Sequence, residues 1–227
     1  MNSDALIRGA GFSALLAGIT FVVLGQIGTP NTLSVVTTGR WLVVHYVALA
    51  MSVFGLAGIT GIYVRQARAA GWLGLISYLA LGFWFVLILP FNFIEAFLLP
   101  PLAATSPEFV ESFLAVVSRS TVDPSLAMLA WLWAAADIAF LLGGLTFGIA
   151  SLRARVLSRW GAGLLTFGFA AVPVFGLLPR EVGSLVAVPI GLGLAWLGVS
   201  VWFGSRTPTE SLAASPATTT IRPTGVK

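Results

Sequence analysis

Six stretches of the chain are each about 20 residues long and nearly free of charge, at 9–29, 41–63, 71–94, 126–150, 158–178 and 184–204. An apolar helix of about that length crosses the roughly 30 Å hydrocarbon core of a bilayer. About a quarter of the residues in a soluble domain are charged, whereas this chain has 9% charged and 58% hydrophobic residues. The sequence therefore predicts an all-α, polytopic membrane bundle of six transmembrane helices over residues 1–204.

The basic residues predict how this bundle is oriented. Cytoplasmic loops of membrane proteins are enriched in Lys and Arg, and a cytoplasmic N-terminus places nine of the twelve basic residues in the cytoplasm. These nine are Arg8, Arg65, Arg68, Arg153, Arg155, Arg159, Arg206, Arg222 and Lys227. Only Arg40, Arg119 and Arg180 then lie outside. We expect both termini to be cytoplasmic and the charges to contact membrane lipid headgroups, with no role in binding nucleic acid.

Two segments outside the spans have a recognisable character. Ser106 and Pro107 are typical of an N-cap and a first helical position, and apolar residues with helical spacing follow them. We expect a short amphipathic helix over 107–118 that lies on the outer surface, either as a lid over a cavity or as plain connecting structure. Residues 205–227 are rich in Thr, Ser, Pro and Ala, which predicts a disordered cytoplasmic tail.

Two cytoplasmic turns resemble each other. GIYVRQARAAGWLG at 61–74 and GIASLRARVLSRWGAG at 148–163 both run from a helix end through arginines to a Trp-Gly helix start. The similarity suggests a parallel repeat in which spans 2 and 3 correspond to spans 4 and 5. The alternative is that any basic turn with an interfacial tryptophan has this appearance. Trp41, at the start of the second span, is likewise expected to be an interfacial residue.

The second of these turns, followed by a glycine-rich span, LLP and GLGLAWLG, resembles a group of bacterial six-helix integral membrane proteins. The resemblance covers the C-terminal third of the chain. It implies a location in the bacterial cytoplasmic (inner) membrane, and it implies no activity and no site residues.

Three ionisable residues lie within the predicted spans or directly at a span end, namely His45, Glu95 and Asp137. An ionisable side chain at the centre of a membrane helix costs about 2.5–3.5 kcal/mol on insertion, so each is a candidate for function. At about 1.5 Å per residue from the cytoplasmic arginines, His45 and Glu95 lie near the outer surface and Asp137 lies deeper. They are expected to line one outward-opening polar pocket. Its floor would be Asp137, and its mouth would hold Arg40, Asn92, Arg180 and Glu181.

Each of these residues also has a structural explanation. Glu95 could lie at the water interface, His45 could bond to a backbone carbonyl, and Asp137 could join two helices by a hydrogen bond. The spacing of the three carries no metal-binding motif, so we expect no metal and no cofactor.

Three functions fit such a pocket. The first is an accessory membrane protein that binds a small ligand or lipid, alone, as a homo-oligomer or with other membrane subunits. The second is a small proton-coupled transporter. The third is a membrane enzyme whose carboxylates act as general acid and base on a lipid or isoprenoid.

Overall fold

The computed structural model describes residues 3–121 and 123–204, and all regular structure in these residues is helical. The long elements are α1 (Ser3–Ile27), α3 (Gly39–Phe93), α6 (Ala127–Ala154), α7 (Arg159–Phe175) and α9 (Ala187–Gly204). Shorter helices are α2 (Leu33–Val36), α4 (Leu99–Thr105), α5 (Pro107–Val117) and α8 (Arg180–Gly183). A π-helical turn covers Ile94–Leu98, and 3₁₀ turns cover Pro124–Leu126 and Ser184–Val186. The predicted tail at 205–227 lies outside the described residues.

By length and composition, four helical stretches are apolar enough to cross a membrane: Ala5–Ile27, Gly39–Thr105, Pro124–Ala154 and Arg180–Gly204. The prediction of six spans differs from this count at two places. The stretch Gly39–Thr105 contains two of the predicted spans. The apolar helix α7 has only 17 residues and is therefore not among the four stretches. The all-α class is confirmed, and the helix lengths are compatible with a membrane protein.

The long helix α3 turns back on itself at Gly71, whose φ of 58° and ψ of −151° are not helical. Glycine adopts such a backbone readily because it has no Cβ. The two halves of α3, residues 39–70 and 72–93, then run antiparallel. Their contacts show this register, since Thr60 bonds to Tyr78 near the turn and His45 lies beside Glu95 far from it.

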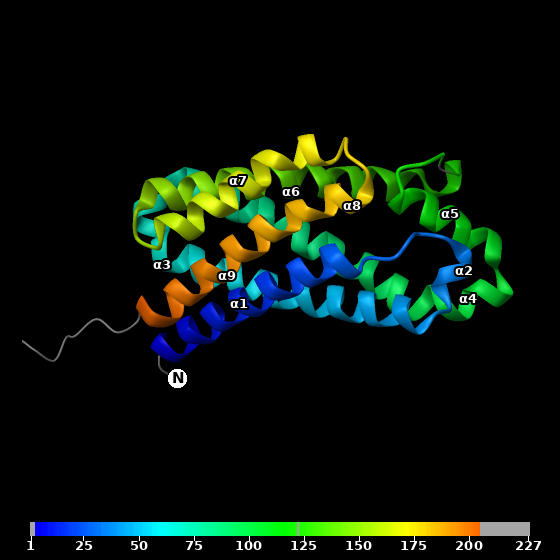
Figure 1. Ribbon diagram of the computed structural model, residues 1–227, viewed down its shortest axis with the longest axis horizontal. Helices are drawn as coiled ribbons and strands as arrows, with labels where there is room; N and C mark the ends of the chain where they lie inside the picture. The colour runs from blue at the N-terminus through cyan, green and yellow to red at the C-terminus, as the bar shows by residue number, and fades with distance from the viewer. Residues whose placement is uncertain (1–2, 122, 205–227) are drawn as a thin grey trace, which may run out of the picture.

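Figure 1 shows the long helices lying side by side along the longest axis of the molecule. The start of α1, the end of α9 and the turn between α6 and α7 gather at one end, which we call the basic end. Arg8, Arg153, Arg155 and Arg159 lie near these points of the chain. Arg65 bonds to the carbonyl of Gly204 at the end of α9, and Arg68 follows Arg65 by about one helical turn. The helices α2, α4 and α5 gather at the opposite end, which we call the capped end (Figure 1).

Small residues bring α1 and α9 into backbone contact. A Cβ added at Gly18 would lie 2.3 Å from the carbonyl oxygen of Gly191, and one added at Gly198 would lie 2.6 Å from that of Gly11. In a bilayer the hydrophobic effect does not drive helices together, so helices associate by close van der Waals packing, which small residues allow.

The helix α5 begins at Pro107, as predicted, but the Ser106 side chain makes no capping bond. Its apolar face packs into a hydrophobic cluster at the capped end. This cluster consists of Val36, Trp41, Phe91, Leu99, Val110, Phe113, Leu114 and Val116. The apolar stripe of 107–118 therefore covers the end of the bundle.

Candidate functional site

His45 and Glu95 face each other inside the hairpin formed by the two halves of α3. Nε2 of His45 lies 3.5 Å from Oε2 of Glu95, and the two residues are only 6% and 4% exposed. A buried ionisable group needs a partner, because transfer of an isolated charge out of water is costly. Here each of the two groups is the partner of the other.

The tautomer of His45 is fixed by its backbone contact. Nδ1 lies 2.8 Å from the carbonyl oxygen of Trp41, which can only accept, so Nδ1 carries a proton. Nε2 therefore faces the Glu95 carboxyl with either a lone pair or a second proton. If one proton lies between Nε2 and Oε2, the pair has no net charge. If that proton is lost, a charged Glu95 carboxylate is buried beside a neutral His45 ring.

Glu95 reaches this position through the π-helical turn at Ile94–Leu98. In this turn the N–H of Leu99 bonds to the carbonyl of Ile94, and the next residue, Pro100, has no N–H. The backbone carbonyl of Glu95 is thus left without a helical donor. It accepts a hydrogen bond of 2.8 Å from the indole Nε1 of Trp41.

Trp41 therefore contacts both members of the pair. Besides the bond to the Glu95 carbonyl, its ring packs against the His45 ring with 4.0 Å between centroids. The residue is fully buried, so the expectation of an interfacial tryptophan was wrong. The sequence contained a signal for its role, since Trp41 and His45 are four residues apart and share a helix face.

A second polar contact lies next to the pair. Nδ2 of Asn92 donates to Oγ of Ser52 over 3.3 Å, and Ser52 donates to the carbonyl of Ala48. Ser52 follows His45 by two helical turns and Asn92 precedes Glu95 by one, so the two contacts are successive layers of the same hairpin. Asn92 thus lies in the layer next to the His45–Glu95 pair, bonded to Ser52.

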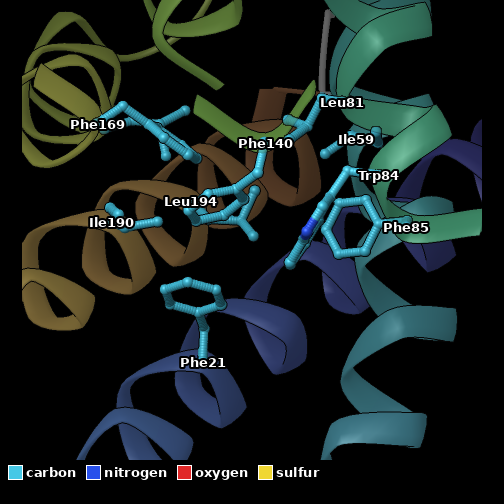
Figure 2. Close-up of a pocket in the computed structure, with 10 residues that line it drawn as sticks. Phe21, Ile59, Leu81, Trp84, Phe85, Phe140, Phe169, Ile190 and Leu194 are labelled. Carbon is cyan, nitrogen blue, oxygen red and sulfur yellow. The ribbon is translucent and has the colours of Figure 1, made fainter. Parts of the chain in front are cut away.

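Below these layers the hairpin becomes apolar. The ring of Phe85 lies against Gly55, where an added Cβ would be 2.1 Å from the ring. A cavity of only about 20 Å³ follows, which is about the space of one water molecule. Figure 2 shows its walls, which come from α1, α3, α6, α7 and α9. They are Phe21, Ile59, Leu81, Trp84, Phe85, Phe140, Leu165, Phe169, Ile190 and Leu194.

Polar contacts resume only toward the basic end. The hydroxyls of Thr60 and Tyr78 lie 3.1 Å apart, and Nε2 of Gln66 donates to Oγ of Ser151 over 2.7 Å. The apolar layer thus separates the His45–Glu95 pair from the polar groups of the basic end.

Asp137 has a different partner. Its Oδ2 accepts from Nε and Nη2 of Arg119, at 2.8 and 2.7 Å, and the two side chains are 34% and 68% exposed. The ion pair connects the segment after α5 to α6. Asp137, which was predicted to form the floor of the pocket, is therefore part of a half-buried ion pair.

The arginines of the predicted mouth bond to backbone. Arg40 donates to the carbonyl of Ile27, and Arg180 donates to that of Thr29 over 2.7 Å. Both fix the connection between α1 and α2. Arg40 therefore stabilises the capped end, and the structure shows no contact of its guanidinium with the His45–Glu95 pair.

An open polar cleft of about 350 Å³ lies elsewhere at the capped end. It is formed by the α1–α2 connection, α5 and the residues after it, and its walls are Asn31, Thr32, Leu33, Glu111, Leu114, Ala115, Ser118 and Ser120. None of the seven residues of the predicted pocket lines this cleft.

In residues 3–121 and 123–204, no group of three or more His, Asp and Glu side chains could hold a metal ion. Comparisons of the chain with protein-family models, with curated proteins and with solved structures find no match.

Proposed function

We propose that the chain is a six-span protein of a bacterial cytoplasmic membrane, with both termini in the cytoplasm. The six spans would be α1, the two halves of α3, α6, α7 and α9. Support comes from the arginine distribution, since six of the nine described arginines belong to the segments near the basic end, which also holds the start of α1 and the end of α9 (Figure 1). In this arrangement the basic end faces the cytoplasm and the capped end faces outside.

Within this arrangement we propose that the protein is a small proton-coupled carrier. The observation that carries the proposal is the buried His45–Glu95 contact, in which Nδ1 of His45 bonds to a backbone carbonyl and Nε2 faces the Glu95 carboxyl. Buried ionisable pairs within membrane helices are typical of proton relays and substrate pathways.

The depth of the pair supports access from the outer side. Counting about 1.5 Å per residue from the turn at Gly71, His45 lies about 39 Å and Glu95 about 36 Å from that turn. The pair is therefore near the outer boundary of a hydrocarbon core of about 30 Å. In the proposed orientation, the cap formed by α2, α4 and α5 lies on the outer side of the pair.

The apolar layer supports a carrier rather than an open pore. A dry constriction excludes ions and water until the helices around it move. Pro90 near the end of α3 and the π-helical turn that follows α3 interrupt regular helical hydrogen bonding, and such a movement would be centred there.

Proton uptake into liposomes tests the proposal. The purified protein would be reconstituted with a trapped pH-sensitive dye, and uptake would be driven by a potassium diffusion potential. We expect uptake above that of empty liposomes, and a loss of at least about tenfold in Glu95→Gln, since one proton-binding group disappears.

Asp137→Asn is the matched control, because it also removes one carboxylate at membrane depth but leaves the pair intact. We expect its uptake to equal that of the wild type. Equal uptake by wild-type and empty liposomes, or an equal loss in both variants, would contradict the carrier.

A second candidate is a small-ligand-binding accessory protein, and the observation that favours it is the open cleft beside Glu111. This second function predicts that the protein takes up no protons and that it binds a ligand whose affinity depends on Glu111. An enzyme with paired carboxylates gains no support, because Glu95 pairs with His45 and Asp137 pairs with Arg119.

A further inference from the structure

A cavity of about 390 Å³ lies at the basic end, between the end of α6 and the start of α7. Its walls are Leu152, Arg155, Leu157 and Arg159. Sites for small molecules have volumes of about 300–1,000 Å³, so a compact charged group fits here.

Among the described residues, the two arginines of this cavity have no acidic partner. In the part of the chain that the structure describes, neither guanidinium has a carboxylate within ion-pair distance, whereas Arg119 at the capped end is paired with Asp137. Guanidinium groups bind phosphate oxygens through paired, charge-assisted hydrogen bonds. The cavity is therefore suited to a phosphate group.

Arg155 has a backbone conformation that its side chain does not favour. It ends α6 in the left-handed region, with φ 53° and ψ 23°, where glycine is the most common residue. The geometry of the helix end favours glycine at this position and gives no reason for an arginine. Its side chain lines the cavity, which gives the residue a use that glycine could not provide.

The other walls are apolar and lie at the level of the interface. Leu152 and Leu157 line the cavity, and the neighbouring Trp160 is 73% exposed. Exposed tryptophans at helix ends mark the headgroup level of a bilayer. A ligand here would thus have an anionic group for the arginines and apolar parts for the leucines.

We propose that this cavity binds the headgroup of an anionic phospholipid, with its phosphodiester between Arg155 and Arg159 and its glycerol backbone over Leu152 and Leu157. Basic pockets between membrane helices on the cytoplasmic side bind such headgroups. The proposal rests on the membrane orientation proposed above but not on the proton chemistry of His45 and Glu95.

Native mass spectrometry of the detergent-purified full chain tests it, with phosphatidylglycerol and phosphatidylcholine titrated in parallel. We expect one phosphatidylglycerol to bind per chain in preference to phosphatidylcholine. The variant Arg155→Gln/Arg159→Gln should bind phosphatidylglycerol at least about tenfold more weakly, because each basic residue near an anionic lipid contributes about 1 kcal/mol.

The control is Arg68→Gln/Arg153→Gln, which removes the same charge from the same end outside the cavity. We expect its affinity to stay within about threefold of the wild type. An equal loss in both double variants would overturn the proposal in favour of diffuse surface attraction. Glu95→Gln should bind the lipid normally, so loss of proton uptake and loss of lipid are separable.

Two further measurements separate lipid binding from an effect on folding and from the binding of a free anion. Arg155→Gly supplies the residue preferred at this helix end, so it should leave stability without lipid unchanged or higher while lowering lipid affinity. Inorganic phosphate at the same concentrations should not displace the lipid. Full displacement by phosphate would assign the cavity to a free anion and would overturn the lipid site.

Discussion

The indole Nε1 of Trp41 donates to the backbone carbonyl of Glu95 over 2.8 Å, although 54 residues separate the two in the chain. This bond satisfies a carbonyl that the π-helical turn and Pro100 leave without a donor. It also holds the backbone of Glu95 where the side chain meets His45. The acid of the site is therefore positioned by a residue on the other half of the hairpin.

Trp41→Phe should lower the free energy of unfolding by about 1–3 kcal/mol, because the buried Glu95 carbonyl loses its donor. Denaturation in mixed detergent micelles would measure the change. Trp72→Phe is the control, since Trp72 is 79% exposed and should shift stability by less than about 0.5 kcal/mol. Equal stability of Trp41→Phe and wild type would show that the indole bond contributes nothing.

Gly18→Ala should destabilise the contact of α1 with α9 by about 1–3 kcal/mol. The new Cβ would lie 2.3 Å from the Gly191 oxygen and 2.6 Å from the Ala195 nitrogen, and backbone atoms cannot rotate away. Thermal unfolding in detergent would report the loss. Gly9→Ala in the same helix meets nothing within 4 Å and should keep or slightly raise stability. An equally tolerated Gly18→Ala would mean that the two helices are not in backbone contact.

Asp137→Asn should cost less than about 1 kcal/mol, because exposed ion pairs contribute little. The Arg119–Asp137 contact is partly open to solvent, so its contribution should shrink further as salt is added. Unfolding of wild type and variant at low and high salt would measure this. A large loss of stability that is insensitive to salt would show that Asp137 has a buried role.

Asp123 provides a pH test at the capped end. Hydrogen bonds from the side chain and the backbone N–H of Ser125 lower the pKa of Asp123 below its ordinary value of 3.8. A lowered pKa means that the contribution of this carboxylate to stability is present above pH 3.8 and is lost as pH falls through the folded pKa. The Ser125 amide resonance should therefore titrate with a midpoint below 3.8. Ser125→Ala should move that midpoint of the Asp123 carboxyl upward, and an unmoved midpoint would contradict this cause.

The sequence predicted the helices better than the contacts between them. Apolar length located the helical stretches, and the arginine pattern located the basic end, because both depend on composition along one segment. It also predicted His45 and Glu95 at similar depth, because depth follows from counting residues along a helix.

The partner of Asp137 could not be predicted in the same way. Its pairing with Arg119 depends on the path of the segment after α5, and a helical face pattern does not describe that path. Trp41 was misassigned because an interfacial tryptophan and a buried donor look alike at a helix start. The buried role of Trp41 depends on the Glu95 carbonyl, which has no helical donor because of the π-helical turn, and the sequence does not reveal that turn.

The most direct test of the central claim is an infrared pH titration of the reconstituted protein, which follows the stretching band of protonated carboxyl groups. We predict one buried carboxyl that gains and loses a proton as the outer pH changes, with its band absent in Glu95→Gln, shifted in His45→Gln and unchanged in Asp137→Asn. A band that persists in Glu95→Gln would contradict the assignment of the proton-binding group to the His45–Glu95 pair.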